Sequence, residues 1–273
     1  MAIRQHVVRN GIGALVCLWW PLLDLACVQE APSLPGEVVV VRTLLFVAGE
    51  QNFSISPDGQ WLLFAEGPDS RGNVDFRLLN TRTRQVVTVE ATPDRERSTS
   101  PLYDMGTWSD DATKVFIPGT HRSGFVIEIG TSTARLKPFL TAQFPVRRQP
   151  KLPVVFKKVS SREIWVVDAE DQSLVLARHA ANGWLTTHLE VSFIDASADG
   201  SCVTYSIDEG RGSFAGSSRS YLLKISPRPG LWALGRSFLG PVRFDPVDQR
   251  MYGVRQGRAN GKEIRTWRSP GCH

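Results

Sequence analysis

The stretch FSISPDGQWLLFAEG, Phe53 to Gly67, contains two apolar runs separated by a four-residue turn. In this turn Pro57 fixes its own φ angle, Asp58 can accept a hydrogen bond from the backbone two residues later, and Gly59 tolerates a positive φ. Because the flanking runs alternate with the period of a strand, the stretch predicts a β-hairpin with a tight reversal at residues 56–59.

Three further stretches repeat this pattern of a small or apolar residue, a Ser or Asp, a polar turn and an alternating run. They are WSDDATKVFI (108–117), ASADGSCVTY (196–205) and FDPVDQRMYG (244–253). The long interval between the second and third of these four copies predicts one more, which we place at VVFKKVSSREIWVVD, Val154–Asp168. There we expect two strands joined by a shortened turn at Ser160–Ser161. The copies then recur about every 44 to 53 residues.

A second pair of strand-like runs follows most of these hairpins, as in VDFRLLN and QVVTVE after the first. Four strands per unit, a period of this size and no amphipathic helix are typical of a β-propeller. We therefore expect an all-β fold of about five four-stranded blades, or six if the third region contains a further degenerate unit. The segment Gly36–Gly49 is expected to add the outer strand of the last blade and close the ring, which removes exposed sheet edges.

The hairpins resemble the WD40-like Tol-B β-propeller repeat, whose hallmark is SPDG between an inner strand and an apolar second strand. Residues 56–59 match this motif fully, residues 197–200 match it in three of four positions, and residues 109–112 and 245–248 are degenerate. The resemblance covers about residues 45–268. It implies a propeller of the Tol-B-like superfamily, which is typically six-bladed, and says little about activity because members include both enzymes and binding proteins.

The N-terminal segment is typical of a secretory signal peptide, with Arg4 and Arg9 before the uncharged run GIGALVCLWWPLL. We expect a signal at 1–26, a linker at 27–36 and one propeller domain at 37–269, with blades at about 45–92, 100–141, 150–190, 191–237 and 238–269. Ala26 and Cys27 fit a bacterial lipobox, whereas Asp24 and Leu25 do not. Cys27 is therefore either a lipidation site or a residue near a peptidase site, and an uncleaved membrane anchor is the alternative to export.

Composition gives weak functional information. The formal net charge of +5 is too small by itself to indicate nucleic-acid binding. Cys202 and Cys272 could pair in an oxidising compartment, but no motif links them. The chain has no nucleophile elbow, phosphate loop or zinc-binding helix motif, and its His residues are scattered, so we expect no cofactor and no metal.

The recurring Asp58, Asp111, Asp199 and Asp248 are interpreted as turn residues and not as catalytic carboxylates. In a propeller, the loops between second and third strands share one face with the connections between blades. Arg recurs in four of these five loops, which favours recognition of carboxylate or phosphate, although acidic residues in the same loops would neutralise part of the charge. The residues that we expect to contact a partner are Arg71, Arg122, Arg211, Phe214, Arg219 and Arg258.

From these features we expect an exported, non-catalytic propeller in the periplasm or cell envelope that binds a protein or peptide. Either the arginines select an acidic partner, or they only keep the exposed loops soluble. The alternative is a propeller hydrolase or lyase that acts on a glycan or lactone at the central channel. Such an enzyme would need converging carboxylates. The acids nearest to inner strands are Asp104, Asp195 and Asp245.

Overall fold

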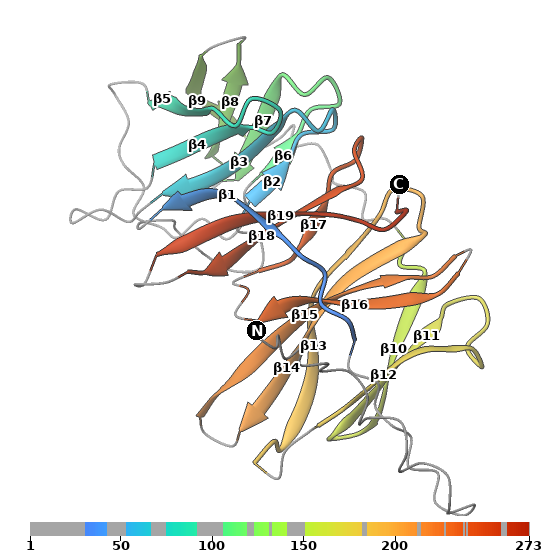
Figure 1. The fold of residues 1–273 in the computed structure, drawn as a ribbon. Helices are drawn as coiled ribbons and strands as arrows, with labels where there is room; N and C mark the ends of the chain where they lie inside the picture. The colour runs from blue at the N-terminus through green and yellow to red at the C-terminus, as the bar shows by residue number, and fades with distance from the viewer. Residues whose placement is uncertain are drawn as a thin grey trace, which may run out of the picture.

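The computed structural model describes residues 31–42, 53–66, 75–91, 106–118, 123–130, 133–140, 151–181, 185–211, 214–226, 228–236, 238, 240–257 and 261–272. In these ranges the chain forms nineteen β-strands and no helix. The strands belong to five groups, blades one to five, which follow the chain (Figure 1). Within the described residues there is no helix of the length and apolarity that a membrane span requires. The predicted signal and Cys27 lie outside them.

Blades one and two are complete antiparallel meanders. Blade one contains β2 (Phe53–Ile55), β3 (Trp61–Glu66), β4 (Asp75–Asn80) and β5 (Val86–Ala91). Blade two contains β6 (Thr107–Trp108), β7 (Lys114–Pro118), β8 (Ser123–Ile129) and β9 (Ala134–Leu140). The outer strands β5 and β9 also pair in parallel, with Val89 opposite Ala134, which joins both blades into one eight-stranded sheet. This unpredicted pairing covers the outer edges of both blades.

Blade three shows three described strands, β10 (Val154–Ser160), β11 (Glu163–Asp168) and β12 (Val175–Ala180). Seven residues, 181–187, separate β12 from β13, which is the first strand of blade four. This connection is too short for a further strand and its turns, so β12 is the last strand of blade three. Hence β10 and β11 are the second and third strands of the blade.

The predicted role of Val154–Asp168 as the first two strands of the third unit is therefore wrong. The short turn at Ser160–Ser161 joins the second and third strands and does not replace an SPDG turn. The error has a simple cause, since both hairpins of a blade show the same alternation of apolar residues.

Blade four contains β13 (His188–Ala196), β14 (Cys202–Arg211), β15 (Phe214–Lys224) and β16 (Gly230–Arg236). Blade five contains β17 (Arg243–Phe244), β18 (Arg250–Gln256), β19 (Lys262–Arg268) and, as its outer strand, the N-terminal β1 (Glu37–Arg42). Figure 1 shows the blue β1 beside the red β19. The predicted closing strand is confirmed. The chain is a β-propeller.

The segment before β1 also contacts blade four. Ser33 forms a parallel bridge with Ala233 of β16, and Leu34 N donates to Ala233 O at 2.9 Å. Residues 32–34 therefore run along the outer strand of blade four, and residues 37–42 then form the outer strand of blade five. At the opposite end of the chain, Cys272 forms a disulfide with Cys202 of β14, so both terminal segments attach blade five to blade four.

The hairpin turns have the hydrogen bonds that the SPDG pattern predicts. Ser56 Oγ donates to Asp58 Oδ1 at 2.6 Å and accepts from Trp61 N, while Asp58 Oδ1 accepts from Gln60 N two residues later. The same bonds recur around Ser109 and Asp111, and around Ser197 and Asp199. In the turn of blade five the accepting carboxylate is that of Asp245, which accepts from Val247 N, whereas Asp248 pairs with Arg250.

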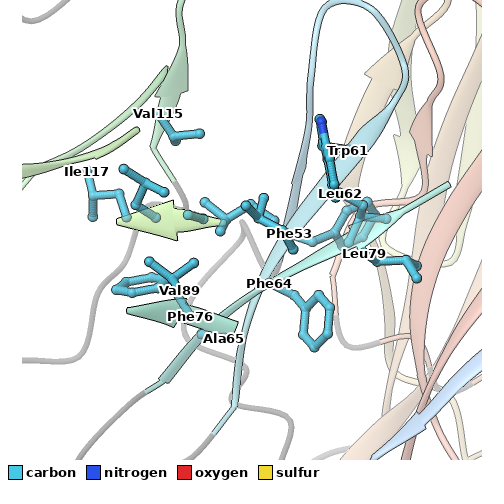
Figure 2. Close-up of a cluster of buried hydrophobic side chains, with 14 of the residues drawn as sticks. Phe53, Trp61, Leu62, Phe64, Ala65, Phe76, Leu79, Val89, Val115 and Ile117 are labelled. Atoms are coloured by element: carbon cyan, nitrogen blue, oxygen red, sulfur yellow. The ribbon is translucent and has the colours of Figure 1, made fainter. Parts of the chain in front are cut away.

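Among the described residues, three clusters of buried apolar side chains hold the blades together. The first joins blades one, two and five, the second joins blades three and four, and the third joins blades four and five. Figure 2 shows part of the first cluster, with Phe53, Leu62 and Phe76 of blade one and Val115 and Ile117 of blade two. Complete burial of each such side chain contributes about 1.5–3 kcal/mol. This packing makes the blades a rigid support for their loops.

Candidate functional site

The face that we predicted to contact a partner is recognisable at blades three and four. We call it the loop face, because it contains the loops between second and third strands and the connections between blades. Leu189, in the first residues of blade four, donates from its backbone N to Ser161 O in the second loop of blade three, at 2.8 Å. Thr187 in the same connection donates to Gly210 O, where blade four turns into its own second loop. The predicted sharing of one face is confirmed here.

A pocket of about 220 Å³ lies between these two blades, close to the loop face. Its lining residues come from β10, β11 and β13 and are Phe156, Lys158, Ile164, Leu189, Glu190 and Val191. Ile164 and Leu189 are buried and form the floor, and Lys158 is exposed. Because neighbouring residues of a strand point to opposite faces, Glu190 directs its side chain away from that of Leu189 and Val191. The pocket is thus lined by four apolar residues together with Lys158 and Glu190.

A buried aromatic and polar cluster packs behind Phe156. His179 of β12 lies with its Nε2 2.8 Å from the hydroxyl of Tyr205 on β14, and the His179 and Tyr221 rings are 4.6 Å apart. Burial, with a smaller contribution from the nearby Arg219 charge, lowers the pKa of His179 to about 4. Burial also raises the pKa of Tyr205 well above its ordinary value. Both side chains are therefore neutral near pH 7 and serve as a structural pair across the two blades.

Arg219 is the predicted contact residue whose side chain the structure describes. It faces Ile207 across the β14–β15 ladder, on the side of blade four that packs against blade three, and it hydrogen-bonds Tyr221. Arg211 and Phe214 pair with each other at the end of the same hairpin, on the loop face. Arg71, Arg122 and Arg258 lie outside the described residues. The structure thus brings three of the six predicted residues to one blade.

Three of the four recurring turn acids, Asp58, Asp111 and Asp199, accept hydrogen bonds from their own turns, as predicted, whereas Asp248 pairs with Arg250. Asp111 accepts hydrogen bonds from the Ser109 hydroxyl and from the backbone and hydroxyl of Thr113, and these bonds lower its pKa to about 2. A carboxylate that is held in its ionised form by local donors is a poor general acid. No cluster of metal-binding side chains occurs among the residues that the structure describes.

The acids that we considered for catalysis are also used structurally. Asp195 Oδ2 accepts from Phe244 N at 3.1 Å, which ties the inner strands of blades four and five together. Asp245 accepts from two backbone N–H groups of its own turn. Asp104 lies outside the described residues.

Sequence reasoning missed one carboxylate pair. Glu190 and Asp208 are direct partners in the β13–β14 ladder, so their Cβ atoms are about 5 Å apart. No sequence motif shows this pair, because it depends on the register of two long strands that place residues eighteen positions apart side by side. The pocket was missed for the same reason, since its walls come from two blades.

No protein-family model and no curated protein matches the chain. Among solved structures, it is similar to U3-55K, at 10% identity over 84% of this chain and 98% of that chain, with a TM-score of 0.43. It is similar to an oligogalacturonate lyase in complex with manganese, at 10% identity over 88% and 99%, with a TM-score of 0.37. It is also similar to the β-propeller domain of the Trilobed protease from Pyrococcus furiosus, at 12% identity over 80% and 68%, with a TM-score of 0.24. These similarities carry no argument about function.

Proposed function

We propose that the chain is an exported, non-catalytic β-propeller of the cell envelope that binds a protein or peptide at the loop face of blades three and four. The observation that carries this proposal is the largely apolar pocket between β10, β11 and β13, with the exposed Lys158 in its lining. Binding residues are commonly placed in this way, on loops and clefts that a rigid scaffold positions.

The size of the pocket favours a peptide over a small-molecule substrate. Pockets that enclose drug-sized ligands and cofactors have volumes of about 300–1,000 Å³. At about 220 Å³ this pocket is below that range and matches a single apolar side chain. A partner that inserts one residue and covers the surrounding loops would use the remaining surface of the face.

The Cys202–Cys272 disulfide supports the proposal of export, because such bonds persist mainly in oxidising compartments. The SPDG turn and its copies support membership in the Tol-B-like propeller family, which we likewise propose. Acylation of Cys27 would attach the protein to a membrane, and mass spectrometry of the mature N-terminus tests it. An N-terminus that begins before residue 27 would contradict both the cleavage and the lipid.

A pull-down from an envelope extract of the source organism tests the binding function. We expect wild-type protein to recover a partner that Val191→Phe loses, because the larger ring fills the pocket from a half-buried position. The matched control is Val175→Phe on β12, a half-buried valine of blade three that does not line the pocket. Equal recovery with wild type and Val191→Phe would refute the pocket as the binding site.

The Glu190–Asp208 pair favours a second candidate function, a propeller hydrolase or lyase that acts on a glycan or lactone. Two facing carboxylates can divide the roles of acid and base. The test is turnover of a panel of such substrates by wild type and by Glu190→Gln. Turnover that the substitution abolishes would replace the binding proposal with the enzymatic one.

A further inference from the structure

The charges around the pocket indicate which peptides it accepts. On β10, Phe156 and Lys158 project to the same side, so the ammonium group lies next to an apolar wall. Lys158 is also the ladder partner of Ile164, which forms the floor. If a peptide ligand places an apolar side chain against Ile164, the residues next to that side chain therefore lie close to the Lys158 ammonium group.

A second positive charge borders the pocket on the side of blade four. Val191 pairs with Ile207, and Ile207 pairs with Arg219, so Arg219 lies two strand spacings from the pocket wall, about 10 Å, on the same face. Its charge is felt where blades three and four pack together, since it contributes to the lowered pKa of His179. Arg236 is the ladder partner of Arg219 and is exposed at the end of β16.

The negative charge on this face is smaller. Glu209 pairs with Leu189 and is the acid of β14 on the side of blade four that faces blade three. Asp208 and Glu190 project to the opposite side of the sheet, as strand alternation requires. Lys158, Arg219 and Arg236 therefore outnumber Glu209 and Glu190, the latter of which lines the pocket, and complementary charge guides the choice of partner.

Resting on the binding function proposed above, we propose that the ligand is an acidic segment of a partner protein in which carboxylate side chains flank one large apolar residue. The apolar residue enters the pocket, one carboxylate pairs with Lys158, and another lies near Arg219. A single C-terminal carboxylate would satisfy one of these two cations, whereas an acidic segment reaches both. We therefore commit to side-chain carboxylates within a segment.

A random peptide library displayed on phage tests this inference with the full-length mature protein. We expect selection on wild type to enrich sequences in which Asp or Glu flanks Leu, Ile, Met or Phe. Synthetic versions of the enriched peptides, with amidated C-termini, are then titrated by fluorescence anisotropy. Lys158→Glu should weaken their binding about tenfold or more, since like charges placed together oppose association.

Lys157→Glu is the matched control. It makes the same change of charge one residue away, on the opposite face of β10, where Lys157 Nζ bonds Gln172 O. We expect less than about a threefold effect, because exposed charges beyond a distance of about 8 Å are largely screened at physiological salt. Circular dichroism melting curves confirm that both variants fold.

Three results would overturn the inference. They are enrichment of neutral peptides, equal effects of Lys157→Glu and Lys158→Glu, and binding that survives replacement of the acidic residues by Ser. If one of these results occurs while Val191→Phe still abolishes partner recovery, the binding function stands and only the acidic ligand is refuted. If Val191→Phe also leaves recovery unchanged, both proposals fail.

Discussion

Gly59 of blade one lies so close to Asp245 of blade five that a Cβ atom on Gly59 would be 2.2 Å from Asp245 Oδ1. The Asp245 side chain is 5% exposed, and its Oδ1 atom already accepts from Val247 N and Asp248 N. The glycine of the SPDG turn is therefore fixed by two independent requirements. Its φ of +66° suits a residue without a side chain, and a neighbouring blade occupies the space that a side chain would need.

Gly59→Ala should destabilise the protein more than Gly200→Ala, and the difference isolates the contact between blades. Gly200 has a similar φ of +70° in the equivalent turn of blade four, but no atom lies within 4 Å of the point where a Cβ atom would stand. A left-handed conformation costs Ala about 1–2 kcal/mol at both sites. At Gly59 the Asp245 turn must also move, which adds about 1–3 kcal/mol. Urea unfolding gives the free energy of unfolding of both variants. Equal losses of stability would show that the Asp245 turn moves aside without a loss of stability.

Much of the fold could be predicted because propeller turns are encoded locally. Ser56, Asp58 and Gly59 determine their hairpin through bonds that span five residues or fewer, so the same pattern identifies the turns at Ser109 and Ser197. The closing strand was predictable because β19 needed an outer neighbour. The parallel pairing of β5 with β9 has no local signal, since it depends on how two finished blades meet.

The site was less predictable for a related reason. Alternation of apolar residues identifies a strand but not its place in the blade, so Val154–Asp168 was assigned to the wrong pair of strands. With β10 as a second strand, Phe156 and Lys158 face blade four and line a pocket that no single unit contains. Arg219 was selected for its loop, but it lies within β15, on the side of blade four that packs against blade three.

Removing the Cys202–Cys272 disulfide should lower stability substantially. The bond closes a segment of 70 residues between blade four and the C-terminus, and the chain-entropy relation gives about 4 kcal/mol for a loop of this length. Cys202→Ala/Cys272→Ala should therefore unfold at a lower urea concentration than wild type. The matched comparison is wild type with and without reductant, which should approach the double variant, while the variant itself should not respond to reductant. A variant as stable as oxidised wild type would contradict the prediction.

The closing strand should be sensitive to charge at one position. Val40 is 8% exposed and belongs to the cluster that joins blades one, two and five, whereas Val38 on the same strand is half-buried. Val40→Asp should cost at least about 3 kcal/mol, since it places an unpaired carboxylate in an apolar environment. Val38→Asp should cost much less. Thermal melting separates the two variants, and similar losses would mean that β1 is not held by this cluster.

The His179–Tyr205 pair should make stability depend on pH. The pKa of His179 is lowered from 6.5 to about 4 in the folded protein, so between these values the unfolded chain binds a proton that the folded chain does not. Stability from this group is fully present above pH 6.5 and is lost as the pH falls toward 4. A shift of this size corresponds to about 3 kcal/mol.

Urea unfolding of wild type and His179→Gln at about pH 7.5 and about pH 4.5 measures this contribution to stability, because acids that titrate in both proteins cancel in the comparison. His179→Gln should be less stable than wild type at the higher pH, where it perturbs the bond to Tyr205, and should lose less stability on acidification. If both proteins lose stability equally between the two pH values, His179 is not the buried neutral group that links blades three and four.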